Sequence, residues 1–161
     1  MSQRETRVGL ISDTHGLLRP EALAFLRGSA LIIHGGDIGG ASILQELAAI
    51  APVTAVRGNN DRDCWADALP NNAALEVGER LIYVVHTIAQ LEIDPVALGF
   101  HVVVSGHSHK PSVYERRGVL YVHPGSAGPR RFTLPVSVAE LRVVGTSVEA
   151  RVVELDVAKQ A

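Results

Sequence analysis

The sequence predicts an α/β fold in which two β-sheets pack against each other with helices outside them. Strand-like and helix-like segments alternate in the N-terminal part of the chain, whereas strand-like segments follow one another in the C-terminal part. Short polar clusters come directly after several of the strands. With 161 residues, of which 47% are hydrophobic, the chain suits one domain with a sizeable core, and we assign residues 1–161 to it.

The N-terminal part has the order β-α-β-α-β. Continuous apolar runs predict strands buried on both faces, over 8–12, 30–34 and 53–56. Arg19-Pro20-Glu21 opens the first helix and Gly28 ends it, because proline fits a first helical turn and glycine a helix end. Ser42 is the predicted N-cap of the second helix, which Pro52 stops. This order favours a parallel sheet with right-handed crossovers.

The C-terminal part predicts a second sheet. After a turn at Pro70-Asn71-Asn72, strands are predicted over 81–86 and 102–105, followed by hairpins of 113–115 with 119–122 and of 136–139 with 148–152. The sequence shows no internal repeat, linker or low-complexity segment, and we expect residues 158–161 to fray.

The composition excludes several classes of protein. The net charge is -2 at pH 7, so the chain lacks the basic field that non-specific nucleic-acid binding requires. No apolar stretch reaches the roughly 18 residues of a membrane span, and residues 1–7 lack the apolar segment of a signal peptide. Cys64 is the only cysteine, which rules out an internal disulfide. We therefore expect a cytoplasmic protein without membrane or strong nucleic-acid partners.

Four polar clusters follow predicted strands, and their side chains are typical metal ligands. They are Asp13-Thr14-His15, Gly36-Asp37, Gly58-Asn59-Asn60-Asp61 and Gly106-His107-Ser108-His109. Loops at strand ends are where a rigid sheet presents functional groups, and Asp, His and Asn together form a mixed oxygen and nitrogen ligand set. The ordered clusters predict a two-metal hydrolase site.

The spacing within the clusters has a physical interpretation. Residues two apart on extended backbone point the same way, so Asp13 and His15 could reach one ion, and His107 and His109 could line one wall. The glycines before the ligand candidates permit tight turns and close backbone approach. Asp37 is the natural carboxylate to bridge two ions.

These motifs resemble the calcineurin-like metallophosphoesterases, in particular their small single-domain bacterial and archaeal phosphodiesterases. The resemblance rests on the four clusters together with His86, Pro124-Gly125-Ser126 and Pro129-Arg130, and it covers nearly the whole chain. It implies a four-layer α/β/β/α sandwich of two mixed sheets. It also implies two divalent ions, with manganese as a common occupant and iron, zinc, nickel or magnesium as alternatives. The implied ligands are Asp13, His15, Asp37 and His109 for one ion, and Asp37, Asn59, His86 and His107 for the other.

The expected reaction is the hydrolysis of phosphate esters, most naturally of a small phosphodiester, by a hydroxide that bridges the two ions. The ions contribute +4 and the Asp13 and Asp37 carboxylates -2, so the centre attracts anionic phosphate. We predict Asp37, Asn59, Asp61 and His107 as catalytic residues, with Asp61 orienting a ligand histidine. Arg130 or Arg131 could contact the phosphate, His34 and His101 are interpreted as structural, and a homodimer stays open.

The chain departs from the family pattern at three positions. Asn60 stands where many members have a histidine thought to protonate the leaving group, Thr87 replaces a glycine after His86, and His123 replaces an asparagine. An amide is not a general acid at neutral pH, so Asn60 favours substrates with good leaving groups. The alternatives are a non-catalytic scaffold, as in a retromer subunit of this fold with a decayed site, or a phosphomonoesterase, protein phosphatase or nuclease.

Overall fold

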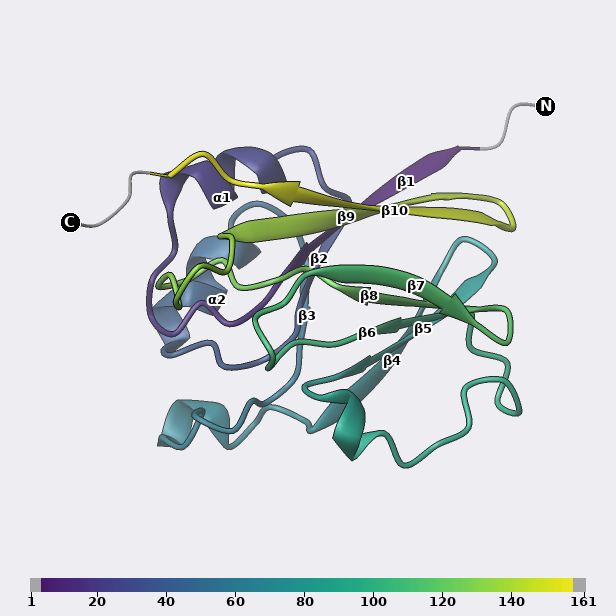
Figure 1. The fold of residues 1–161 in the computed structure, drawn as a ribbon, viewed down its shortest axis with the longest axis horizontal. Coiled ribbons are helices and arrows are strands. Elements are labelled where there is room, and N and C mark those ends of the chain that lie inside the picture. Colours follow the sequence, from purple (N-terminus) through teal and green to yellow (C-terminus); the bar gives the residue numbers. More distant parts are fainter. Residues whose placement is uncertain (1–3, 158–161) are drawn as a thin grey trace.

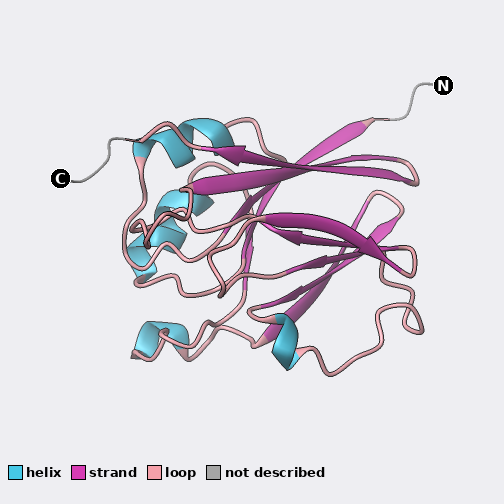
Figure 2. Ribbon diagram, viewed as in Figure 1, coloured by secondary structure: helices cyan, strands magenta, loops and turns pink. Residues whose placement is uncertain are grey.

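The computed structural model describes residues 4–157, which form two five-stranded mixed sheets that face each other (Figure 1). The predicted fraying of residues 158–161 lies outside the described part of the chain. The strands account for most of the ordered structure, and the helices are short (Figure 2). This architecture agrees with the expected α/β sandwich.

The first sheet has the strand order β10-β9-β1-β2-β3. Its strands are β1 (Glu5–Ile11), β2 (Leu31–His34), β3 (Val53–Ala55), β9 (Ser137–Val144) and β10 (Ser147–Glu154). β1, β2 and β3 are parallel, as predicted, and β9 joins β1 in the antiparallel direction. The three parallel strands therefore end at one edge of the sheet, where the loops carrying Asp13, Asp37 and Asn59 begin.

The two α-helices connect these parallel strands. Helix α1 (Pro20–Leu26) begins at the predicted proline. Helix α2 (Ala41–Ala48) begins one residue before Ser42, with Gly40 as its N-cap, so the predicted cap was wrong. Ser42 lies inside the first turn instead. Helix α2 ends at Ala48, before Pro52, and the backbone N–H groups of residues 49–51 form a turn that bonds back to Gln45 and Leu47.

The second sheet has the order β4-β5-β6-β8-β7. Its strands are β4 (Asn72–Val77), β5 (Arg80–Val85), β6 (Val102–Val104), β7 (Ser112–Arg116) and β8 (Val119–His123). β5, β6 and β8 are parallel, and the predicted hairpin of β7 with β8 is confirmed. β4 was not predicted, because the asparagines near its start were interpreted only as a turn; it pairs with β5 through a tight turn at Gly78.

Three apolar clusters hold these layers together. The largest lies between the sheets, where Val8 and Leu10 of β1 belong to the same cluster as Val84 of β5 and Val104 of β6. A second joins the outer face of the first sheet to α1 and α2. The third lies on the outer face of the second sheet, where Leu91 and Phe100 pack on the strands. No α-helix covers this face in residues 4–157; the 3-10 helix Ile88–Gln90 and the loop that follows it lie there instead. None of the helices in residues 4–157 has the length and apolar character needed to cross a membrane.

Candidate metal centre

Six of the predicted ligands meet in two groups where β1, β2, β5 and β6 end. The groups are Asp13 with His15 and His109, and Asp37 with His86 and His107. Within each group, one potential ligand atom from each residue lies within 4.8 Å of the others. The four strand tips therefore bring together side chains that are up to 96 residues apart in the chain, counted from Asp13 to His109.

Asp37 connects the two groups. Its Oδ2 lies 3.3 Å from Nε2 of His86 in its own group and 3.8 Å from Nε2 of His15 in the other. In the first group, Oδ1 of Asp13 is 3.6 Å from Nε2 of His109, and Nε2 of His15 is 3.3 Å from the same nitrogen. This geometry gives Asp37 the central position that a bridging carboxylate needs.

The backbone at these residues is left-handed rather than extended. Five of the six candidate ligands have positive φ angles, between 44° and 79°: Asp13, His15, Asp37, His107 and His109. Non-glycine residues rarely adopt this conformation, and it persists only where neighbouring contacts hold it. The predicted extended backbone at these residues was therefore wrong. His107 and His109 belong to different groups, whereas Asp13 and His15 share one. Backbone hydrogen bonds from Asp13 to Gly36 and from His15 to Asp37 fix the loops.

Two glycines are required by close approach between the site loops. A Cβ at Gly58 would lie 2.1 Å from the backbone nitrogen of Asp37 and 2.2 Å from its Oδ1. A Cβ at Gly106 would lie 2.1 Å from Oγ of Ser12 and 2.9 Å from Oδ2 of Asp13. Both loops can therefore pack against the carboxylates only without a side chain at these positions.

Asp61 supports the loops rather than a histidine. Its carboxylate accepts hydrogen bonds from the backbone N–H groups of Ile38 at 3.0 Å, Gly39 at 3.1 Å and Gly58 at 2.9 Å. The prediction that Asp61 orients a ligand histidine is thus corrected, because its oxygens are occupied by the loops after β2 and β3. Asp61 is buried and positions the backbone that follows Asp37 and the backbone that precedes Asn59.

Asn60 contacts the connecting carboxylate directly. Its backbone N–H donates to Oδ1 of Asp37 at 2.9 Å, and its side-chain amide donates to Oδ2 at 3.4 Å. The neighbouring Asn59 is exposed and lines a hollow with Arg57, Asn71 and Gln90. Asn59 therefore lies on the loop after β3, next to the residue that contacts Asp37, with its own side chain exposed.

The remaining predicted residues lie as follows. Thr87 has an extended backbone with φ -134°, so its position does not require glycine, and His86 before it is fully buried. Arg130 and Arg131 are exposed, and the charge of Arg131 is one cause that lowers the pKa values of His15 and His109. His34 is structural, as predicted: its Nδ1 accepts from Gly36 N–H and its Nε2 contacts Oγ1 of Thr14 at 3.0 Å.

The hydrogen bond of His86 with Gly35 directs its other ring nitrogen, Nε2, at Asp37. Its Nδ1 lies 2.7 Å from the carbonyl oxygen of Gly35, so Nδ1 carries the proton and donates it. In the neutral imidazole Nε2 then has no proton, and it is a buried atom without a hydrogen-bond partner among the described residues. Burial opposes a charge on His86, but its contact with Asp37 and its bond with Gly35 outweigh burial and raise the pKa of His86, so a proton or a cation is favoured between Nε2 and the carboxylate.

The pKa values show what burial and contacts do to the charges of the site. Burial raises the pKa of Asp13, which is 0% exposed, to about 6. Burial also opposes ionisation of Asp37, but hydrogen bonds with His86 and Asn60 outweigh it and lower the pKa of Asp37. Burial lowers the pKa of His109 to about 4 and that of His34 to about 3. The lowered pKa values keep His15 and His109 neutral beside the carboxylates, and neutral imidazoles with carboxylates are the donor set that a divalent metal ion requires, so these residues fit such ions.

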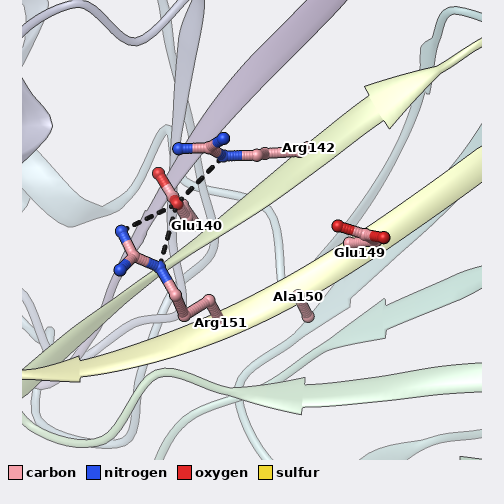
Figure 3. A pocket seen from close by; sticks show the side chains of 5 residues that line it. All are labelled: Glu140, Arg142, Glu149, Ala150 and Arg151. Atoms are coloured by element: carbon pink, nitrogen blue, oxygen red, sulfur yellow. Dashed lines mark hydrogen bonds and ion pairs between the residues drawn. The ribbon is translucent and has the colours of Figure 1, made fainter.

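A second charged cluster lies far from this edge, on the outer face of β9 and β10. A hollow of about 410 Å³ is lined there by Glu140, Arg142, Glu149, Ala150 and Arg151 (Figure 3). Arg142 and Arg151 both point their guanidinium groups at Glu140 (Figure 3). Because the buried acid of this hollow, Glu140, is paired with both arginines that line it, we interpret the hollow as structural.

The fold and the site define a metallophosphoesterase class of protein: two mixed sheets with paired groups of acidic and histidine side chains at their strand tips. Comparison of the sequence with family models matches residues 6–145 to the calcineurin-like phosphoesterase superfamily domain. The chain belongs to this family.

Relatives and solved structures agree with the assignment. The chain is 35% identical to a probable metallophosphoesterase of Methanothermobacter thermautotrophicus over 159 residues, covering 91% of each chain. In fold it is similar to Vacuolar Protein Sorting 29 of Cryptosporidium parvum, with a TM-score of 0.81 and 22% identity over 94% of this chain and 92% of that one. It is also similar to an archaeal phosphodiesterase, with a TM-score of 0.75 and 22% identity over 92% of this chain and 100% of that one.

Proposed function

We propose that this protein hydrolyses small phosphodiesters with the help of two divalent metal ions. The observation that carries the proposal is the position of Asp37, whose Oδ2 lies between the two histidine groups and faces the unpaired Nε2 of His86. Family membership supports the hydrolysis of phosphate esters as the reaction class.

The residues have separate tasks in this proposal. One ion would be held by Asp13, His15 and His109, and the other by His86 and His107, with Asp37 shared between the two groups and the amide oxygen of Asn59 as the predicted further ligand of the second. When bound, divalent ions polarise phosphate oxygens and lower the pKa of water, so that hydrolysis needs no nucleophilic side chain. Manganese suits this mixture of oxygen and nitrogen ligands, as do iron, zinc, nickel and magnesium.

The protein orients this chemistry through hydrogen bonds to the ligands. Gly35 fixes the tautomer of His86, and the backbone N–H of His107 donates to Oδ2 of Asp13 at 3.1 Å, which directs Oδ1 toward His109. Such outer contacts orient metal ligands and maintain their protonation state. With two neutralising carboxylates against four positive charges, the loaded site attracts an anionic phosphate ester.

Asn60 supports a diester with a good leaving group as the substrate. Its amide already donates to Asp37 and has no acidic proton to give to a departing alkoxide. The sequence pI of about 6.4 also provides no basic surface for a long nucleic-acid strand, which argues against a nuclease.

The proposal is tested by metal dependence and substrate preference together. Chelator-treated protein should lack activity, and added Mn²⁺ should restore hydrolysis of bis(4-nitrophenyl) phosphate above that of 4-nitrophenyl phosphate. Other divalent ions and cyclic nucleotides complete the panel. Full turnover in metal-free protein would contradict the metal-dependent mechanism, whereas faster hydrolysis of the monoester would contradict the diester preference.

An Asn60→His variant tests the role of the leaving group. A histidine there could donate a proton, so hydrolysis of monoesters with poor leaving groups should improve relative to activated aryl diesters, by roughly 10-fold to 100-fold. Asn71→His is the matched control, because Asn71 is exposed nearby but does not contact Asp37. An unchanged ratio in a metal-loaded Asn60→His protein would show that the proton comes from another group.

A non-catalytic scaffold of the same fold is the second candidate, and Asn60 is the observation that favours it. The two intact ligand groups favour the enzyme. Metal content and turnover measured on one preparation distinguish the two functions: bound metal without hydrolysis of any ester in the panel would indicate the scaffold.

A further inference from the structure

A cavity of about 200 Å³ adjoins the second ligand group on the side of β7 and β8. Thr87, which follows His86, lines it, and so do Gly106 and Ser108 on either side of His107. The cavity therefore shares its wall with the loops that carry two candidate metal ligands. Figure 1 shows β8 between β6 and β7 in this sheet, so the cavity lies along neighbouring strands.

Two tyrosines give this cavity a flat aromatic wall. Tyr114 of β7 and Tyr121 of β8 are directly paired across the hairpin, and their rings stack with centroids 5.0 Å apart and planes 2° apart. Tyr114 is 45% exposed although it lines the cavity. Stacking holds each ring in one orientation. A further flat group can therefore stack on the pair with little loss of side-chain conformational entropy.

A buried hydrogen-bond donor also lines the cavity. His123 is 6% exposed, and its Nδ1 accepts the backbone N–H of Gly125 at 2.8 Å, so the proton of the neutral ring is on Nε2. That nitrogen makes no hydrogen bond of ordinary geometry within residues 4–157, although the backbone of Gly106 lies close enough to affect the pKa of the ring. Buried donors are rarely left without a partner, which indicates a group that the chain itself does not supply.

The lining shows which part of a substrate the cavity suits. Its residues are Thr87, Ile88, Ser105, Gly106, Ser108, Ser112, Tyr114, Tyr121, Val122 and His123, none of them an acid, lysine or arginine. An anionic phosphate would find no counter-charge there and belongs at the metal ligands. The volume equals that of roughly seven water molecules, which suits a single small ring system.

We propose that this cavity is a subsite for one flat aromatic group of the phosphodiester, whose phosphate lies at the neighbouring ligand groups. The inference rests on the proposed function and adds the substrate class: diesters with an aryl or nucleobase-like substituent. Tyr114 and Tyr121 contact the ring, and Nε2–H of His123 donates to an acceptor on it. Tyr114 is therefore a specificity-determining residue that takes no part in the hydrolysis itself.

The test compares two non-hydrolysable probes by calorimetry on the Mn²⁺-loaded protein. Phenylphosphonate and methylphosphonate present the same anionic group to the metals, but only the first has a ring. Phenylphosphonate should bind roughly 2-fold to 10-fold more tightly. Tyr114→Ala should remove this preference, and Tyr114→Phe should keep it. Val113→Ala is the matched control, because Val113 is an exposed neighbour on β7 that does not line the cavity.

Each outcome decides the proposal. Equal affinity for both phosphonates in the unmodified protein overturns the subsite and leaves the metal site intact. A preference that survives in a folded Tyr114→Ala protein, and also in Tyr121→Ala, overturns the assignment to the tyrosines. If neither phosphonate binds the metal-loaded protein, the proposed function fails, and the subsite fails with it.

Discussion

Buried carboxylates occur in two regions of this protein, and their surroundings differ in one respect. Glu140 on β9 is 1% exposed and contacts three arginines: Arg7, Arg142 at 3.2 Å, and Arg151 at 3.0 Å. These contacts outweigh burial and lower the pKa of the Glu140 carboxyl group. The residues lie in regular strands, so the chain itself supplies the cations that this carboxylate needs.

At the strand tips no arginine or lysine pairs with the buried acids among residues 4–157. Asp13 and Asp37 are 0% and 3% exposed and face imidazoles, and the pKa values of His15 and His109 are lowered by burial. Nε2 of His86 and Nδ1 of His109 are buried without hydrogen-bond partners in the described chain. The comparison shows that a buried acid alone does not indicate function. A buried acid that faces neutral ligands on strained backbone indicates a place for an external cation.

The largest expected effect is that of Asp37→Asn. The change removes the carboxylate that faces both ligand groups, so the rate of diester hydrolysis should fall by roughly 1,000-fold or more. Metal content should also fall, measured by elemental analysis of the same preparation. Asp67→Asn changes an exposed acid away from the ligand groups and is the control: its hydrolysis rate and its metal content should both be unchanged. A variant with two bound ions and an unchanged rate would contradict the central role of Asp37.

The second-largest expected effect is that metal binding stabilises the folded protein against unfolding. Because the ions bind the assembled strand tips and not the unfolded chain, Mn²⁺ at 100 times its dissociation constant should add about 2.7 kcal/mol to the free energy of unfolding. Denaturant unfolding with and without Mn²⁺ measures this difference. Glu140→Gln should gain the same stabilisation from Mn²⁺, since Glu140 pairs with arginines and belongs to neither ligand group. An absence of stabilisation in a protein shown to bind Mn²⁺ would mean that the unfolded chain binds the ion equally well.

The sequence was sufficient to predict most of the strands and the composition of the site. The parallel strands were predictable because buried strands are continuous apolar runs, and the clusters were predictable because polar residues interrupt those runs at strand ends. Asp13, Asp37 and His109 follow such strands in the structure. The assignment of individual ligands depended on the family resemblance.

Other features depend on contacts that sequence periodicity does not encode. The left-handed backbone at Asp13 and His15 is held by hydrogen bonds to the loop after β2, and Asp61 bonds to backbone that precedes it by more than 20 residues. The Glu140 cluster depends on the register of β1, β9 and β10, which sets Arg151 directly opposite Glu140. The tyrosine pair also follows from register, although two tyrosines at matching positions of a predicted hairpin were a usable signal.

Glu140→Gln should destabilise the fold without affecting hydrolysis. Arg142 and Arg151 are 51% and 63% exposed and can return to water, so we expect a loss of about 1–3 kcal/mol in the free energy of unfolding rather than more. Denaturant unfolding measures the loss. Glu149→Gln is the control, because that exposed acid lies beside Arg142 on the same face. A normal rate per folded molecule would separate this cluster from the metal centre.

The smallest effect is the pH dependence of that loss, and it tests whether Glu140 acts through its charge. The folded pKa of Glu140 is lowered from 4.5, so its contribution is fully present above pH 4.5 and is lost as the pH falls through the folded value. The difference in unfolding free energy between the unmodified protein and Glu140→Gln should therefore be constant from pH 7 to about 5 and shrink at lower pH. Because both proteins contain the same other carboxylates, the contributions of those groups cancel in the difference. Chelator in both samples excludes an effect of metal release. A difference that does not shrink at any pH below 4.5 would show that Glu140 stabilises the sheet by packing rather than by pairing with arginine.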